Sequence, residues 1–155
     1  MIVISDTTPI LSLLKAEQLD LLEKLFGNVI IPKTVYEELT RNPIFESEKV
    51  VIANSPFITV EKVCNQESVK LLRNIAGLDA GESEALVLYE EKNADILLID
   101  EHKGRGVARK MSVKYVGNTW MEQYKKNRSS EDGICTVVAR MKETPDNVQT
   151  LEINF

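Results

Sequence analysis

The chain has 155 residues, a formal net charge of −5 and a hydrophobic content of 43%. A chain of this length is expected to fold as one domain with its own core. It contains no apolar run near the roughly 18 residues that a membrane-spanning helix requires. The acidic balance argues against a protein that coats nucleic acid non-specifically, because such proteins are usually basic. It leaves open an enzyme that concentrates acids at a cation site.

Cysteine and histidine are too scarce for a structural zinc site. The chain has Cys64, Cys135 and a single histidine, His102, whereas a structural zinc ion takes about four such ligands. Residues 1–6 lack the basic region and cleavage site of a secretory signal and are instead typical of a strand. We therefore expect a cytoplasmic protein in which both cysteines are small apolar residues and form no disulfide.

In chain order, the first half of the sequence predicts short buried strands that alternate with helices. Short β-branched runs indicate strands, and leucines at helical spacing indicate helices. Pro9 suits the first position of the helix that follows the first strand. The predicted elements are a strand at 2–5, two helices within 10–26 with a break near 16–17, a strand at 28–31, helices at 34–41 and 45–54, and a strand at 57–60.

The second half continues the same alternation, with Gly77 ending one helix and Asp79 capping the next. The predicted elements are helices at 68–76 and 79–93, a strand at 95–100, a helix at 104–110, a strand at 113–116, helices at 117–126 and 130–142, and an edge strand at 148–155. This alternation predicts an α/β fold, a three-layer α/β/α sandwich with a central, mainly parallel sheet, in one domain that spans residues 1–155.

Two aspartates follow predicted strands. Asp6 comes after the first strand, and Asp100 comes after the most apolar strand of the chain. Ligands of parallel α/β sheets bind beyond the carboxyl ends of the strands, so both residues are candidates for a site. The alternative is that each aspartate only caps the helix that follows it.

Glu82 shares a helix face with Ala85 and Leu86, whereas Glu84 points to nearly the opposite side. The face with Ala85 and Leu86 is expected to pack on the sheet. Glu82 would then lie at the top of this buried face, in the first turn of the helix. The alternative is a capping box formed by Asp79 and Glu82.

Glu38 has a similar setting, since Val35 and Leu39 mark the inward side of its helix and Glu37 points away. The alternative here is an ordinary solvated helix face. All four acids, Asp6, Glu38, Glu82 and Asp100, meet at one sheet edge only if a site exists there.

Clustered carboxylates repel one another and raise one another's pKa unless a cation neutralises them. A site made of oxygen ligands alone suits Mg²⁺ or Mn²⁺, and such ions activate water for attack on a phosphodiester. Lys103, Arg105, Arg109 and Lys110 follow Asp100 and could contact a phosphate backbone. The alternative for these basic residues is a solvated helix surface.

Four segments in this order carry a family resemblance. They are residues 6–9 (Asp-Thr-Thr-Pro), 31–39 (Ile-Pro-x-x-Val-Tyr-Glu-Glu-Leu), 78–85 (Leu-Asp-Ala-Gly-Glu-Ser-Glu-Ala) and 97–101 (Leu-Leu-Ile-Asp-Glu). The chain resembles the PIN-domain superfamily, and within it the short stand-alone prokaryotic proteins of unknown function. The resemblance covers residues 1–126, with a C-terminal helix and edge strand in 127–155.

The resemblance implies a Mg²⁺- or Mn²⁺-dependent endoribonuclease that uses the four acids as catalytic and metal-binding residues. It implies an RNA substrate contacted by the basic residues, and supporting roles for Thr8, which would orient Asp6, and for Glu101. Many relatives are toxins of toxin–antitoxin pairs and form homodimers. An antitoxin or a second subunit could dock on Leu13, Leu14, Leu19 and Leu22, although core packing is the simpler expectation for most of these leucines.

The chain departs from the family pattern at Leu98, where many members have Ser or Thr, and at His102, where many have aspartate. Polar groups around a metal site tune its affinity, so these departures predict a slower enzyme. Two alternatives therefore stay open. One is a binding module for RNA or protein with weak or no cleavage. The other is a phosphatase-like protein phosphorylated on Asp6, although Thr8 stands where such enzymes need a second aspartate.

Overall fold

The computed structural model describes residues 1–41 and 46–117, and every structural statement below concerns these two ranges. The helices predicted at 117–126 and 130–142 and the edge strand predicted at 148–155 lie outside them, Gly117 excepted. Within this part of the chain, no helix is long and apolar enough to cross a membrane.

The centre of the fold is a parallel sheet. Its strands are β1 (Val3–Ser5), β2 (Val29–Pro32), β3 (Ile58–Glu61), β4 (Ile96–Leu98) and β5 (Tyr115–Val116), in the spatial order β3-β2-β1-β4-β5. All four neighbouring pairs run parallel, with Ile4 opposite Ile30 on one side of β1 and opposite Leu97 on the other. A parallel sheet needs long crossover connections, and helices make these connections here.

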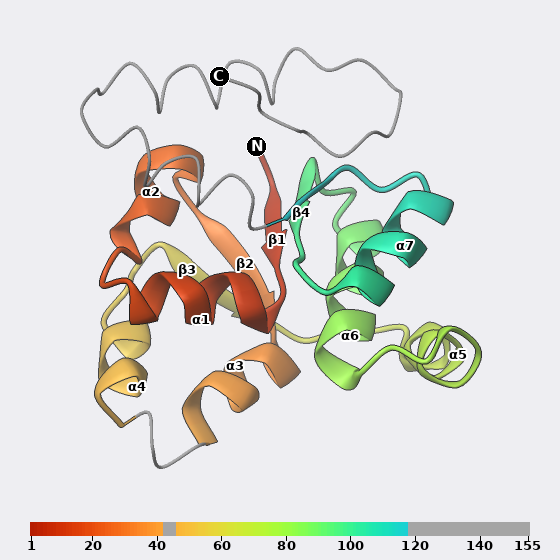
Figure 1. Cartoon of the computed structure of the whole chain (residues 1–155), viewed down its shortest axis with the longest axis horizontal. Coiled ribbons are helices and arrows are strands. Elements are labelled where there is room, and N and C mark those ends of the chain that lie inside the picture. Colours follow the sequence, from red (N-terminus) through yellow and green to blue (C-terminus); the bar gives the residue numbers. More distant parts are fainter. Residues whose placement is uncertain (42–45, 118–155) are drawn as a thin grey trace.

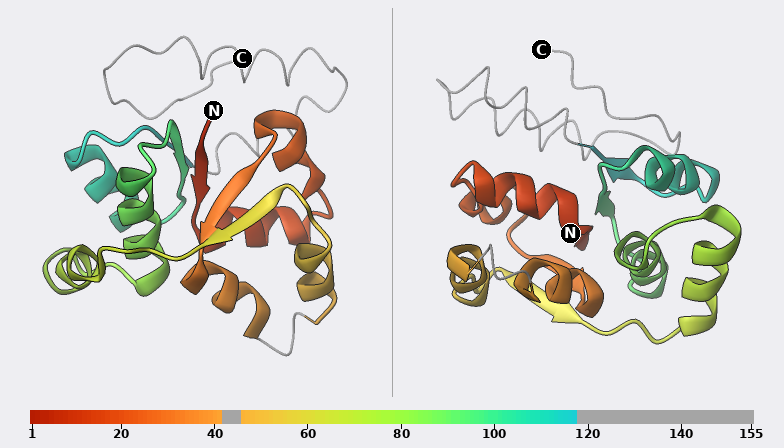
Figure 2. Two further views of the ribbon diagram at one scale, coloured as in Figure 1. Left: turned by 180° about the vertical axis from the view of Figure 1, so that it is seen from behind. Right: turned by 60° about the horizontal axis from the view of Figure 1, so that its bottom comes forward.

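Seven helices of the described ranges cover the two faces of the sheet (Figures 1 and 2). They are α1 (Thr7–Lys15), α2 (Asp20–Phe26), α3 (Lys33–Arg41), α4 (Glu46–Ala53), α5 (Gln66–Ala76), α6 (Ala80–Glu91) and α7 (His102–Lys110). The right-hand view of Figure 2 shows α1 to α4 gathered on one side and α5 to α7 on the other. The predicted three-layer α/β/α sandwich with a parallel sheet is therefore confirmed.

Successive strand residues supply two separate cores. Val3 belongs to the core beneath α1 to α4, and the next residue, Ile4, belongs to the core beneath α5 to α7. Leu98 and Ile99 divide between the two cores in the same way. Side chains alternate across a strand, so a strand buried on both faces must be apolar at every position. This requirement explains the continuous apolar runs in the sequence.

Helix boundaries differ from the sequence-based prediction by a few residues. Helix α1 begins at Thr7, two residues before Pro9, because Asp6 already has the extended backbone of an N-cap. Helix α5 begins at Gln66, because the side chain of Asn65 accepts a hydrogen bond from the Ser68 backbone N–H and caps the helix earlier than expected. Helix α7 similarly begins at His102, before the predicted start.

The predicted interruptions are confirmed. The break between α1 and α2 contains Glu17 with φ of 54°, a left-handed conformation that a continuous helix cannot include. Gly77, with φ of 68°, ends α5 in the left-handed conformation that glycine adopts without a steric penalty.

The connections of the sheet reverse direction at β1. From β1 the chain moves outward to β2 and β3, and it then returns to place β4 on the other side of β1. Parallel α/β sheets bind ligands at such a reversal, beyond the carboxyl ends of the strands. The Asp6 backbone N–H donates to the Leu98 carbonyl at 2.9 Å, which joins the ends of β1 and β4 at this point.

Candidate acidic active site

We refer to the carboxyl edge of the sheet around Asp6, Glu38 and Glu82 as the acidic edge, and Asp6 lies at its centre. It follows β1 directly, is only 3% exposed, and stands at the N-cap position of α1 without making a side-chain capping hydrogen bond. The capping alternative considered from the sequence therefore does not account for its burial. A buried carboxylate without a cap or a basic partner in the described residues is costly unless another group neutralises it.

Glu38 reaches the same place from α3. Its helix lies beside α1 and α6 at the carboxyl edge of the sheet (Figure 1). Its carboxylate accepts a hydrogen bond from the Thr7 hydroxyl, and the Gly81 backbone N–H lowers its pKa. A Cβ atom built on Gly81 would lie 3.0 Å from both carboxylate oxygens of Glu38 and 3.3 Å from Oδ1 of Asp6. Two carboxylates from distant parts of the sequence thus meet at the first turn of α6.

Glu82 lies in the same first turn of α6. It takes part in a capping box and is also buried, so both alternatives considered from the sequence apply to it. Its Oε2 accepts from the Asp79 N–H at 3.1 Å, and Oδ1 of Asp79 accepts from the Glu82 N–H at 2.8 Å, which completes the capping box. Glu82 is nevertheless only 4% exposed, and its Oε1 lies 3.2 Å from a Cβ built on Gly104 of α7. One carboxylate oxygen is used by the cap, and the other faces α7.

Burial and mutual repulsion raise the pKa values of the three acids. Burial, with repulsion from Asp79, Glu82 and Glu38, raises the pKa of Asp6 from 3.8 to about 7, although the Thr7 N–H opposes the shift. Loss of water around the carboxylate is also the largest cause of the raised pKa of Glu38, although the residue as a whole is exposed, and of the buried Glu82, followed in effect by hydrogen bonds that lower it. Asp79 raises all three pKa values. Acids arranged in this way favour a cation or a proton.

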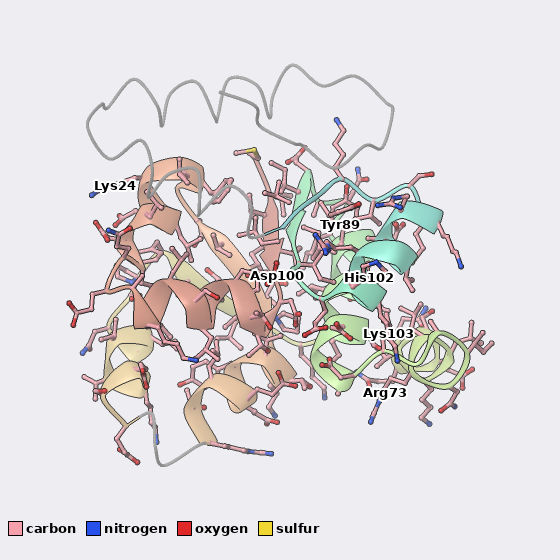
Figure 3. All side chains as sticks on the ribbon, in the orientation of Figure 1. Lys24, Arg73, Tyr89, Asp100, His102 and Lys103 are labelled. Atoms are coloured by element: carbon pink, nitrogen blue, oxygen red, sulfur yellow. The ribbon has the colours of Figure 1, made fainter. Side chains whose placement is uncertain are left out.

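Asp100 is the fourth acid proposed from the sequence, and its strand β4 neighbours β1. It is half-buried and lies two residues beyond the end of β4. Figure 3 shows it on the segment that leads from β4 into α7. The next residue, Glu101, is exposed, stands at the N-cap of α7, and does raise the pKa of Glu82.

The basic residues of α7 point in different directions. Nζ of Lys103 lies 4.0 Å from a Cβ built on Gly77, at the end of α5, where a cation is favoured by the helix dipole. Arg105 lies over Gly117 just after β5, and Arg109 donates to the Tyr115 hydroxyl at 3.1 Å. Arg105 is therefore the basic residue of the three that contacts the carboxyl edge of the sheet.

Three residues close to the acids were not singled out from the sequence. They are Thr7, whose hydroxyl bonds Glu38, and two glycines, Gly81 and Gly104, against which the acids pack. The supporting role predicted for Thr8, to orient Asp6, stays a prediction. A glycine inside a helical pattern signals close packing, so Gly104 could have been found in this way.

The two residues that depart from the family pattern, Leu98 and His102, differ in burial. Leu98 is fully buried in the core beneath α1 to α4, and His102 is exposed at the start of α7 (Figure 3).

The donor set fits a hard divalent cation by its chemistry. Asp6, Glu38 and Glu82 offer only carboxylate oxygens, which suits Mg²⁺ or Mn²⁺. The missing side chain of Gly81 leaves room for oxygens of Asp6 and Glu38, and that of Gly104 leaves room for Oε1 of Glu82. Within residues 1–41 and 46–117, however, no three histidine, cysteine, aspartate or glutamate side chains are close enough together to ligate one ion as they stand.

A three-layer sandwich with acids at the reversal of its parallel sheet is the architecture of PIN-type proteins. The sequence matches a family described as PIN domain over residues 2–146, and the chain belongs to this family. PIN domains are generally nucleases and typically use divalent metals. No curated protein and no solved structure matches the chain.

Proposed function

We propose that this protein is a Mg²⁺- or Mn²⁺-dependent endoribonuclease. The observation that carries the proposal is the meeting of Asp6 and Glu38 against Gly81, one residue before Glu82, at the carboxyl edge of the sheet. Acids held this close together, with raised pKa values, favour a bound cation.

Asp6, Glu38 and Glu82 would hold the cation, and Asp100 would complete the acidic edge. A divalent cation at such a site supplies an activated water and stabilises the leaving oxygen of a phosphodiester. Arg105 would contact a phosphate at the ends of β4 and β5, and Lys103 and Arg109 would contact the flanking backbone. Arginine suits this task because its guanidinium offers parallel donors.

Cleavage assays on the purified chain test the proposal. Single-stranded and structured RNA are incubated with Mn²⁺, Mg²⁺ or EDTA, and the Asp6→Asn and Asp100→Asn variants are compared with the wild type. Asp20→Asn is the matched control, because Asp20 lies in an exposed ion pair with Lys24 on α2. We expect cleavage that requires the metal, survives Asp20→Asn and is lost in both other variants. Cleavage indifferent to EDTA would contradict a metal mechanism.

The same assay separates the enzyme from a catalytically weak RNA- or protein-binding module. Mn²⁺ binding is expected in both cases, because the carboxylates are present in both. Binding of Mn²⁺ without any cleavage would favour the module. A metal-independent phosphoryl group on Asp6, stable to acid and labile to hydroxylamine, would instead favour the phosphatase-like alternative.

The proposal extends to a cytoplasmic toxin that forms a homodimer and pairs with an antitoxin. Cys64 is exposed, so the expectation that it fills an apolar site is wrong for this residue, and Cys135 lies outside the described residues. The four leucines considered for docking are buried in the core beneath α1 to α4, so a partner would need another surface. Leu71 and Ile75, one turn apart on α5, are 60% and 78% exposed and offer one. Light scattering of the wild type and of Ile75→Lys measures whether a dimer depends on this pair.

A further inference from the structure

Glu38 occupies a position that would normally leave its carboxylate mobile. It lies on an exposed part of α3. A glutamate side chain loses up to about 2 kcal/mol of conformational entropy when it is fixed, so it stays in one place only if other groups hold it. The adjacent Glu37 shows the ordinary outcome, since it pairs with Arg41 one turn along its own helix.

Two groups from other elements hold the Glu38 carboxylate. The Thr7 hydroxyl at the start of α1 donates to Oε2, and the same carboxylate packs against Gly81 at the start of α6, whose backbone N–H lowers its pKa. Hydrogen bonds to a charged acceptor are about twice as strong as those between neutral groups. Thr7 and Gly81 belong to α1 and α6, so they fix the carboxylate relative to these two helices as well as to α3.

The space that Glu38 occupies exists because residue 81 has no side chain. A Cβ atom there would lie 3.0 Å from both Glu38 oxygens, which is closer than ordinary van der Waals contact, and 3.3 Å from Oδ1 of Asp6. Helix position 81 has no backbone conformation that demands glycine, because its φ is not positive. Alanine is the better helix former, so the helix gains nothing from glycine at this position.

We propose that Thr7 and Gly81 are positioning residues that hold the Glu38 carboxylate against Asp6, where the two acids share a divalent cation. The inference deepens the proposed nuclease function and rests on it for the identity of the bound ion. The holding of Glu38 is a property of the metal-free protein and does not depend on that function. Groups that orient metal ligands typically change metal affinity by about 10- to 100-fold when they are removed.

The first test removes the hydroxyl of Thr7. Thr7→Val keeps the shape of the side chain, and Thr7→Ser restores the donor. Thr40→Val is the matched control, because the Thr40 hydroxyl donates to the Tyr36 carbonyl within α3 at 2.8 Å and does not hold Glu38. Calorimetric Mn²⁺ titration should show about tenfold weaker binding for Thr7→Val, with wild-type affinity in the other two variants. A larger loss in Thr8→Val than in Thr7→Val would overturn the assignment.

The second test places a side chain in the space beside Gly81 that the Glu38 carboxylate occupies. Gly81→Ala should displace Glu38 and weaken Mn²⁺ binding by about tenfold or more while the helix stays folded. Gly106→Ala in α7 is the matched control, because a Cβ there meets no atom within 4 Å. Equal Mn²⁺ affinity in Gly81→Ala and in the wild type would contradict the proposal.

A metal-free readout separates this proposal from the proposed function. Crystal structures of the metal-free wild type, Thr7→Val and Gly81→Ala should show the Glu38 carboxylate beside Gly81 only in the wild type. If the wild type neither binds Mn²⁺ nor cleaves RNA, the proposed function fails, and the conformation of Glu38 still decides whether Thr7 and Gly81 hold it. A Glu38 side chain that points to solvent in the wild type would overturn the inference outright.

Discussion

Each side of the sheet contributes one glutamate to the acidic edge, and the two are held in different ways. Glu82, from the α5 to α7 side, is 4% exposed and is fixed by a capping box within its own helix. Glu38, from the α1 to α4 side, starts from an exposed position and is fixed by Thr7 and Gly81, which belong to two other helices. One half of the candidate site is therefore organised locally, whereas the other half depends on packing between distant segments.

The largest expected effect comes from neutralising either glutamate. Glu82→Gln and Glu38→Gln should each lower metal-dependent RNA cleavage by about 100-fold or more, because a cation site supplies several kcal/mol of transition-state stabilisation. Cleavage rates at saturating Mn²⁺ measure the effect. Glu37→Gln is the control on the same helix as Glu38. A wild-type cleavage rate in either variant would show that this glutamate, and its side of the sheet, does not take part in the site.

Asp6 lies between the two sides and sets the expected pH dependence of stability. Its pKa is about 7 in the folded chain and near 3.8 when unfolded, so the folded state binds more protons between these values. The contribution of Asp6 to the free energy of unfolding is therefore fully present below its pKa in the unfolded chain. It is lost as the pH rises through the pKa of the folded chain. The metal-free protein should lose about 2 kcal/mol of unfolding free energy between pH 5.5 and pH 8, and chemical denaturation at both pH values measures it.

Two comparisons test whether Asp6 causes this pH dependence of stability. Asp6→Asn should remove most of the pH dependence, because the amide does not titrate in this range. Mn²⁺ should stabilise the wild type more at pH 8 than at pH 5.5, because the ion competes with the proton on the same carboxylates. A wild-type protein that is more stable at pH 8 than at pH 5.5 without metal would contradict the assignment to Asp6.

A smaller effect is expected from breaking the local restraint on Glu82. Asp79→Ala removes the capping box and should cost about 1 kcal/mol of stability. It should also weaken Mn²⁺ binding, because Glu82 loses the partner that orients it. Asn65→Ala removes the comparable cap of α5 and is the control, since Asn65 accepts from Ser68 far from the acids. Equal Mn²⁺ affinity in the two variants would show that Glu82 does not depend on its cap.

The smallest effect is expected at Ser83, next to Glu82 on α6. Ser83 is 0% exposed, and its hydroxyl has no hydrogen-bond partner in the described part of the chain. Its replacement by alanine leaves no polar group unsatisfied and favours the helix. Ser83→Ala should therefore change stability by no more than about 0.5 kcal/mol, or raise it, and should leave Mn²⁺ binding unchanged. A clear loss of stability would reveal a partner for the hydroxyl.

Most of the fold could be predicted because its signals are local. Apolar runs such as the one before Asp100 must be buried on both faces, and the predicted break between α1 and α2 coincides with the left-handed Glu17. Boundaries were less accurate, because one capping side chain, such as that of Asn65, moves a helix start by two residues.

The candidate site was predicted only in part. Asp6 and Glu82 follow from a strand end and a helix face, and the structure places both at the carboxyl edge of the sheet. Their catalytic roles, like those of Glu38 and Asp100, stay predictions. The contacts of Thr7 and Gly81 could not be inferred, because they join residues more than 30 positions apart in the sequence.

Sequence patterns were thus sufficient for the layers of the sandwich, the strands and the acids that end them, because alternation, helical spacing and capping act over a few neighbouring residues. Packing of distant helices was needed to show which oxygen of Glu82 faces α7, that the Thr7 hydroxyl holds Glu38, and why residue 81 has no side chain. The physical reason is that close approach between segments depends on a missing Cβ or on one hydroxyl, and neither leaves a periodic signal in the chain.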